Sequence, residues 1–557
     1  MEKRMVRFST KLTCLETMFA RTILDRHNTL RAKSRRIFDL ARTILFVTIL
    51  FVASECYASP SVDVPLRHWS YDAIEKLAIV GLCDIADIGI RPVSRIKMAN
   101  IVKTAIDKAR DYSGEFEWNE QDYLETLLNK LIDEFRVELV DIGVEVASTF
   151  DQPLPKNTIR LISDMSVEQA YGVFDSDNML FENKDGWVLK DGINSRIKVT
   201  GWAKLADLYA VSITPGIRYS KDDTDLNIEN AHLRINPRGW NTEFSIGRTS
   251  AWWGPGFHGS ILMTDNAFPM DALRINNIRP FRLPGIFKKM GRWSGTWFIS
   301  RMDKKFNLPH ALVSGWKLDY IPSEFLKFGV GHILMFGGKG VNRYGFNDFV
   351  GNSSLFFSSG GGADDPENHI MSGDVQLFLR RIDRFLPIAT GAKLYMEWGA
   401  EDEAKSVPVD LAHIIGAYFT DVFKIPGFDV KAEIAKFHEA FYSHFKYTSG
   451  YTRKGNFIGH HAGGDSEDIA LSAIFSFPEE YRASFTFSHM RSGLTRVFIE
   501  TTDQIKLEFT VINGLKMYNV NNVDVTLFYE FDDIENFENT ALSAKNHILG
   551  AEVTRRF

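Results

Sequence analysis

Cysteine is scarce in this chain of 557 residues, which contains Cys14, Cys56 and Cys83 and no others. The first two lie in an N-terminal segment that we predict to be removed. The remaining Cys83 cannot form an intramolecular disulfide by itself, nor can it build a cysteine metal cluster. We therefore expect no disulfide framework and no cysteine-bound metal.

Long apolar runs are missing as well. Beyond the first sixty residues, no apolar run approaches the length of about 18 residues that a membrane-spanning helix needs. The sequence therefore argues against a helical membrane span in the mature chain.

The N-terminus is typical of a secretion signal. Residues 1–42 carry eleven lysines and arginines, and an apolar core follows from Thr43 to Ser54. Small residues then end at Ala58 with the spacing that a signal peptidase recognises. We predict that residues 1–58 are a signal peptide. A permanent anchor helix is the alternative, although twelve apolar residues are short for a span.

A basic excess is also absent. The formal net charge is −6, and without residues 1–58 the chain has 54 basic and 66 acidic residues, a net charge near −12. Proteins that bind nucleic acids usually carry the opposite balance. We expect no nucleic-acid partner.

Aromatic residues, by contrast, are plentiful at 13% of the chain, and residues 155–557 repeatedly alternate between apolar and polar positions. Such alternation is typical of strands with lipid outside and water inside, although a soluble β-sandwich produces it too. The clearest apolar series are Tyr209, Val211 and Ile213; Ile469 and Leu471; Ile505, Leu507, Phe509 and Val511; and Val523, Val525, Leu527, Tyr529 and Phe531.

Two features favour a barrel in the outer membrane over the sandwich. The chain is predicted to be exported, and it ends on Phe557 behind a mostly apolar register that only Arg555 interrupts. A terminal aromatic of this kind resembles the signal that the barrel assembly machinery recognises. About 400 residues then predict an all-β transmembrane barrel of roughly 16–18 antiparallel strands.

Residues 59–145 show helical periodicity instead. We predict helices over Ser70–Val80, after Ser94, and from about Asn119 to Ile142. This segment resembles a single S-layer-homology module, which implies binding to peptidoglycan or wall-linked glycan through His68, Trp69 and Arg95. A structural plug or cap is the alternative. The matching residues are Val64-Pro65, His68-Trp69, Tyr71 to Ile74, Leu77, Gly81, Arg91-Pro92, Arg95 and Ala99.

The most distinctive stretch lies at 244–298, where tandem tryptophan precedes Gly-Pro-Gly. Its core is Gly247-Arg248, Trp252 to Gly256, Ser260 to Leu262, Asn266-Ala267 and Pro269. This core resembles the capsule assembly Wzi-like family. The resemblance implies an outer-membrane barrel that helps to attach capsular or related polysaccharide to the cell surface, as a lectin and not an enzyme.

Five residues around this turn have the chemistry to bind sugars. Aromatic faces stack on sugar rings, and charged or amide groups bond to hydroxyls. Either tryptophan has a scaffold role as its alternative. The candidates are Arg248, Trp252, Trp253, Asp265 and Asn266.

Other constellations are weaker. His460-His461 near Asp465 has the residue types of a metal site, but the glycine-rich surroundings favour a solvated loop, so we predict no metal site. Lys393, Glu397, Lys431 and Glu433 fall on polar strand faces and suit a wet lumen or a packed interior network. We find no catalytic Ser-His-Asp spacing and expect no cofactor.

Three functions compete at this point: a glycan-attachment barrel, which is favoured, a carbohydrate porin fastened to the wall, and a barrel enzyme acting on lipid or glycan. The expected partners are capsular or other surface polysaccharide, outer-membrane lipid, the barrel assembly machinery, and peptidoglycan or wall-linked glycan.

Overall fold

The computed structural model describes residues 61–557 apart from 85–88, 112–117, 146–154, 341–366, 513–521 and single positions at 156, 177, 222, 238, 402, 405, 406, 409 and 479. The predicted signal peptide, 1–58, lies outside the described residues.

Among the described residues, the N-terminal part contains four helices: α2 (Ser70–Val80), α3 (Arg95–Asp111), α4 (Trp118–Glu134) and α5 (Arg136–Asp141). Apolar side chains such as Leu77, Val102 and Leu131 lie on facing sides and share one buried core. The helices predicted over Ser70–Val80 and after Ser94 are confirmed. None of the helices in the described part of the chain is both long enough and apolar enough to cross a membrane.

The third predicted helix is interrupted at Phe135, which separates α4 from α5. Phe135 adopts φ −107° and ψ 18°, outside helical geometry. The Arg95 guanidinium donates to the Glu134 carbonyl oxygen at 2.5 Å and to the carboxylates of Glu134 and Glu138. It therefore occupies a carbonyl that a continuous helix would use for its own hydrogen bond, which a pattern of apolar residues does not reveal.

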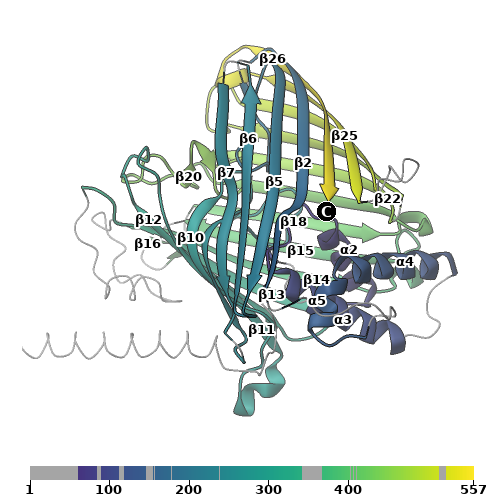
Figure 1. Cartoon of the computed structure of the whole chain (residues 1–557). Coiled ribbons are helices and arrows are strands. Elements are labelled where there is room, and N and C mark those ends of the chain that lie inside the picture. The colour runs from purple at the N-terminus through teal and green to yellow at the C-terminus, as the bar shows by residue number, and fades with distance from the viewer. Residues whose placement is uncertain are drawn as a thin grey trace, which may run out of the picture.

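Eighteen antiparallel strands close into a barrel, within the range of 16–18 that the sequence predicted, and β2 pairs with both β26 and β5 to complete the ring (Figure 1). In order around the barrel they are β2 (Thr158–Phe174), β5 (Gly192–Leu205), β6 (Tyr209–Ser220), β7 (Asp223–Ile235), β8 (Thr242–Thr249), β10 (Met270–Asn277), β11 (Arg292–Arg301), β12 (Leu312–Ile321), β13 (Leu326–Phe336), β14 (Asn368–Leu379), β15 (Gly391–Glu401), β18 (Leu411–Thr420), β19 (Phe428–Phe437), β22 (Ser466–Phe477), β23 (Tyr481–Ser492), β24 (Glu500–Val511), β25 (Val523–Glu535) and β26 (Ser543–Arg556).

The apolar face of the strands points outward, as a bilayer requires. On β6, Tyr209, Val211 and Ile213 are 38%, 38% and 46% exposed, whereas Ala210 and Ser212 between them are buried. β22, β24 and β25 repeat the pattern with exposed leucines and phenylalanines outside. A sandwich would bury this face, so the alternation belongs to a transmembrane barrel.

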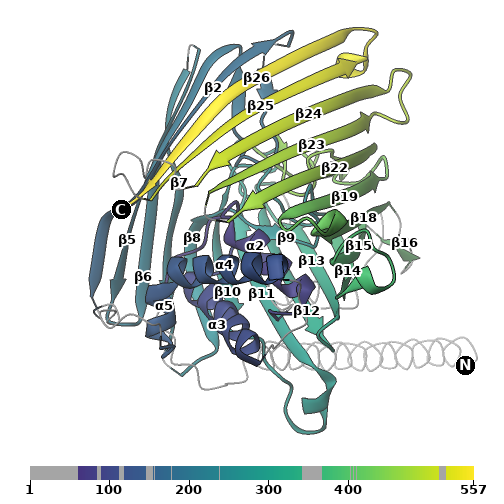
Figure 2. The ribbon, with the colours of Figure 1, turned by 90° about the vertical axis from the view of Figure 1, so that its right-hand side faces the viewer.

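The two ends of the barrel differ. At the proximal end, where β2 begins and β26 ends, several connections are short, such as 206–208 and 322–325. The helices gather at this end, beside the C-terminus (Figures 1 and 2). The opposite, distal end carries longer connections, several of which fold back into the lumen.

Candidate functional site

Three distal connections, which we call the plug loops, fill the lumen: residues 178–190, 250–269 and 438–465. The first contains the hairpin β3 (Asn178–Leu180) and β4 (Val188–Lys190), the second β9 (Trp252–Trp253), and the third β20 (Thr452–Arg453) and β21 (Asn456–Phe457). Nearly every residue of 250–269 is buried. The barrel is therefore packed inside, and its glycine-rich loops are core segments.

The N-terminal region joins this filling from the proximal side. The short strand β1 (Ile90–Arg91) pairs with β9, so that Ile90 lies opposite Trp253 and Arg91 opposite Trp252. The Gly254 N–H donates to the Gly89 carbonyl at 3.0 Å. Segments that enter from opposite ends thus form one small sheet inside the barrel.

Charged residues of the barrel wall hold plug loop 250–269 in place. The Glu433 carboxylate accepts the N–H groups of Phe257 and Gly259 at 2.8 and 3.0 Å and the Tyr395 hydroxyl at 2.5 Å. The Lys393 ammonium donates to the Pro255 carbonyl at 2.9 Å. The sequence left open whether such charged residues face a water-filled lumen or a packed interior network. For Lys393 and Glu433 the structure shows the packed network.

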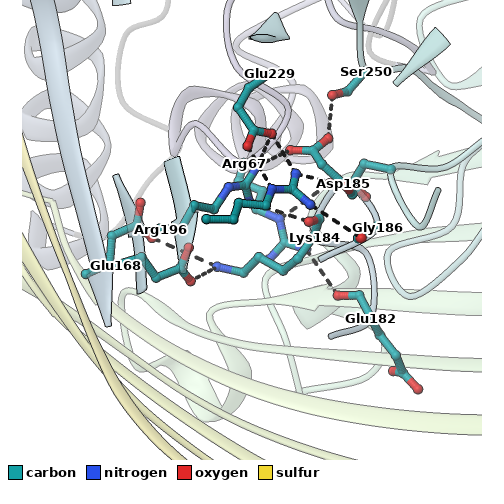
Figure 3. A network of polar contacts seen from close by, with 12 residues as sticks. Arg67, Glu168, Glu182, Lys184, Asp185, Gly186, Arg196, Glu229 and Ser250 are labelled. Carbon is teal, nitrogen blue, oxygen red and sulfur yellow. Dashed lines mark hydrogen bonds and ion pairs between the residues drawn. The ribbon is translucent and has the colours of Figure 1, made fainter. Parts of the chain in front are cut away.

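Plug loop 178–190 is held by a second network, drawn in Figure 3. Lys184 bonds Glu168 of β2 at 2.8 Å, and Asp185 pairs with Arg196 of β5 at 3.2 Å. Glu229 of β7 in turn accepts from Arg196 at 2.9 Å. Buried ions are costly unless each is paired, so the network specifies one position for this loop.

The predicted tryptophan pair lies in the plug. Trp253 is 1% exposed and packs edge-on against Phe298 with ring centroids 5.3 Å apart. Trp252 is 8% exposed, and its indole N–H has no hydrogen-bond partner among the described residues. Both rings therefore support the packing of the lumen, and the Trp252 N–H is a donor for a ligand that reaches it.

The other three predicted sugar-binding residues are divided between the plug and the wall. Asn266 donates to the Phe457 carbonyl at 3.2 Å and so joins two plug loops. Asp265 faces Arg67 at 3.4 Å, and burial raises the pKa of Asp265 to about 6 although Arg67 opposes this. Arg248 lies apart on β8, where it forms a bidentate ion pair with Asp271 at 2.8–2.9 Å. The structure thus does not gather the five residues into one pocket.

The predicted wall-binding residues, in contrast, lie together. His68 lies against Trp69 and Phe135, with ring centroids 5.4 and 6.3 Å away, and the Arg95 guanidinium lies over the Phe135 ring at 4.8 Å from its centroid. Burial lowers the pKa of His68 to about 4, although Glu134 opposes the shift. All three contact other residues of the helical region.

A cavity of about 600 Å³ opens beside them. Its lining includes Arg67, His68, Trp69 and Arg95 on one side and strands β2, β5 and β26 on the other, near Phe557. Charges of both signs line it, so the cavity is polar and suited to water or to a hydrophilic ligand.

The distal rim carries a basic cluster that sequence reasoning missed. Asn307 bonds to the Lys446 carbonyl at 2.7 Å, and the Tyr447 hydroxyl bonds to the Gly337 carbonyl at 3.2 Å, so three connections pack together. Beside these contacts the side chain of Phe445 is 67% exposed. These three connections carry Lys304, Lys305, Lys339 and Lys446, which we call the distal lysine cluster.

These features define the class of protein: a transmembrane β-barrel whose lumen is filled by its own loops and by an N-terminal helical region. One solved barrel agrees with the fold. The Escherichia coli protein described as Wzi, an outer membrane protein involved in group 1 capsule assembly and a carbohydrate binding beta-barrel, is 16% identical, with a TM-score of 0.64, and the match covers 89% of this chain and all of that one. OccD3 of Pseudomonas aeruginosa is 7% identical over 71% of this chain and 91% of its own, with a TM-score of 0.43.

The family description "Capsule assembly protein Wzi" matches residues 170–547, and the chain belongs to that family. The sequence resemblance at 244–298 is therefore confirmed at family level. A curated relative, an uncharacterized 55.8 kDa protein in the cps region of Klebsiella pneumoniae, is 30% identical over 105 residues. That match spans 18% of this chain and 20% of the relative.

Proposed function

We propose that this protein is an outer-membrane barrel that binds surface polysaccharide at its distal end and thereby takes part in capsule assembly. The observation that carries the proposal is the filled lumen of a barrel in the capsule assembly family. Loops that occupy the lumen favour a fixed binding platform over a conduit. The alternative of a carbohydrate porin needs an open path, which the plug loops obstruct.

The distal lysine cluster is our candidate contact surface for the polymer. Ammonium groups attract carboxylates and other acidic groups on a sugar chain, and an exposed ring such as Phe445 offers a face for stacking. One exposed charge contact is worth about 0.2–1 kcal/mol. A long polymer that touches many barrels compensates for this weakness through multivalency. We therefore propose an anionic polysaccharide as the ligand class.

Charge reversal tests this surface. The double variant Lys304→Glu/Lys305→Glu should release polysaccharide into the medium several-fold more than the parent. The matched control is Lys288→Glu/Lys289→Glu, because that pair is equally adjacent and exposed but lies in the 3-10 helix Gly285–Met290 at the proximal end. Retention is measured per folded barrel. Equal retention by both double variants would show that the distal lysines do not bind the polymer.

The role predicted for Arg248, Trp252, Trp253, Asp265 and Asn266 stays a proposal. Their burial supports the scaffold alternative, and the free Trp252 N–H supports a direct contact. Trp253→Ala separates the two if the polymer is counted per folded barrel. If Trp253 supports the fold, the variant should lower the amount of folded barrel. If Trp253 contacts the sugar, the variant should retain less polysaccharide while the amount of folded barrel stays the same.

The arrangement of the chain also supports an orientation. We propose that residues 1–58 are removed as a signal, that the helical region of 59–145 faces the periplasm and that the distal rim faces outward. The assembly machinery is proposed to recognise Phe557, whose N–H donates to the Ser163 carbonyl at 2.8 Å beside the closing pair β2–β26. Deleting Phe557 should lower the amount of folded barrel.

Wall binding by the S-layer-like segment is the remaining part of the proposal. It rests on the proximity of His68, Trp69 and Arg95 at the polar cavity. Full-length protein in detergent should co-sediment with purified cell wall, and Trp69→Ala should reduce this. Sedimentation no greater than that of an unrelated barrel would favour the plug alternative.

A further inference from the structure

Three histidines from two plug loops converge on one carboxylate of the barrel wall. The Nε2 atoms of His258, His460 and His461 lie 3.4, 3.8 and 3.4 Å from Asp468 Oδ2. His460 is fully buried, and the side chain of His461 is 3% exposed. The solvated loop expected from the sequence is therefore wrong for this histidine pair.

The carboxylate beside the histidines is Asp468 and not Asp465, the one that the sequence suggested. Asp465 accepts instead from the Thr495 hydroxyl at 2.8 Å. Glu182 approaches from plug loop 178–190, with its Oε2 3.8 Å from His461 Nε2. The ligand atoms of Glu182, His258 and His461 all lie within 4.8 Å of one another. The cluster thus draws on all three plug loops and on β22.

The spacing matches a small metal ion. Zinc binds imidazole nitrogen and carboxylate oxygen at about 2.0–2.2 Å, and a tetrahedral arrangement then separates two ligand atoms by about 3.3–3.5 Å. The His258–Asp468 and His461–Asp468 distances are both 3.4 Å. Glu182 Oε2 lies somewhat farther away, 3.8 Å from His461 Nε2.

Unpartnered polar atoms point to a ligand independently. Among the described residues, His258 Nε2 and Asp468 Oδ1 are buried and have no hydrogen-bond partner. Buried polar atoms in native proteins are nearly always satisfied, so each exception requires an explanation. A cation between His258 Nε2 and Asp468 Oδ2, which lie 3.4 Å apart, would supply the partner that the His258 nitrogen lacks.

His460 is suited to a positioning role. Its Nδ1 accepts the Ala462 N–H at 3.2 Å, so the neutral ring carries its proton on Nε2 and has no lone pair there for a metal. The Gly259 backbone approaches the His460 ring closely, because a Cβ on Gly259 would lie 1.9 Å from His460 Cδ2. The ring stacks on His461, with the two ring centroids 4.4 Å apart, and so positions that ligand.

We propose that His258, His461, Asp468 and Glu182 bind one divalent transition-metal ion, with Zn²⁺ as the best match to two imidazoles and two carboxylates. The ion links the three plug loops to β22. It thereby fixes the loops that fill the lumen and support the distal rim. The proposal does not depend on which polysaccharide the rim binds.

Metal content of untagged, full-length protein purified in detergent tests the proposal directly. After removal of metal by a chelator and dialysis against Zn²⁺, the parent should retain one zinc ion per chain. His461→Gln and Asp468→Asn should lose it, and His460→Gln should bind about 10–100-fold more weakly, as a positioning residue would. Cobalt(II) in place of zinc should give the visible absorption of a tetrahedral site in the parent.

The matched control is His438→Gln. His438 begins plug loop 438–465 and lies 2.9 Å from the Asp410 carboxylate, but it is half-exposed and outside the cluster. This variant should keep its zinc. Folding of each variant is verified by heat-modifiable migration on gels.

Two results would overturn the proposal. One is a folded parent that retains no zinc and shows no cobalt absorption. The other is zinc retained equally by the parent, His461→Gln and Asp468→Asn, which would place the ion elsewhere. If a variant does not fold, the parent's own stoichiometry and cobalt spectrum still decide the matter.

Discussion

At the scale of single residues, Gly247 shows how closely β7 and β8 approach. Its φ is +138°, and a Cβ there would lie 2.1 Å from the Ala231 carbonyl oxygen. This glycine belongs to the sequence core by which the family is identified, and the structure explains it by backbone contact. It needs no direct part in sugar binding.

Gly247→Ala should destabilise the barrel by more than about 3 kcal/mol, because strain in φ adds to a clash with backbone that cannot rotate away. The control is Gly239→Ala. Gly239 also has positive φ, +78°, but no atom lies within 4 Å of its added Cβ, so about 1 kcal/mol is expected. Urea unfolding in micelles measures both, and equal midpoints would contradict the clash.

His68 supplies a prediction about pH. The folded protein keeps this buried ring neutral down to its pKa of about 4, whereas the unfolded chain takes up a proton below its ordinary value of 6.5. Stability should therefore fall as the pH drops from 6.5 towards 4, by up to about 3 kcal/mol from this group. The charged groups that face it are Glu134, Arg556, Arg95 and Lys130.

His68→Gln removes this proton uptake. Hydrogen exchange of the amides in α2 and α3 measures the local stability of the helical region. Protection in the parent should decline faster than in the variant between pH 6.5 and 4. Parallel pH dependence in the two proteins would show that His68 does not control it.

At the scale of elements, α2 is fastened to the barrel by a buried ion cluster. Lys76 is 2% exposed, and its ammonium lies 2.7 Å from Asp421 and 2.9 Å from Asp429. The two carboxylates raise the pKa of Lys76 despite its burial, so the lysine stays charged. The helix thus supplies the cation that these carboxylates require.

Lys76→Met should loosen α2, since it leaves two buried carboxylates without their cation at a cost of about 3–5 kcal/mol. Lys103→Met is the control, because Lys103 pairs with Asp107 at 3.3 Å on an exposed helix surface, and such pairs contribute little. Limited proteolysis should cut the helical region of the first variant while the barrel stays heat-modifiable. Equal resistance of both variants would argue against the docking role.

At the scale of the whole molecule, the filled lumen predicts electrical behaviour. The parent should show no steady open pore in a planar bilayer, because plug loop 250–269 is held by Glu433 through the N–H groups of Phe257 and Gly259. Glu433→Ala should produce intermittent openings, whereas Glu439→Ala on an exposed part of plug loop 438–465 should not. A steady conductance in the parent would favour the porin alternative.

The sequence by itself predicted the strands, because a strand whose two faces meet different surroundings alternates every two residues. The predicted export signal and the terminal Phe557 then favoured a barrel over a sandwich. The helices over Ser70–Val80 and Arg95–Asp111 were equally predictable, since apolar spacing of three to four residues is a local property. Only the tertiary structure decided that Trp253 faces the plug and that His258 meets His461, about two hundred residues later in the chain. The contacts of a loop depend on where its flanking strands lie in the barrel and on what else packs in the lumen. These long-range conditions leave no periodic pattern in the sequence.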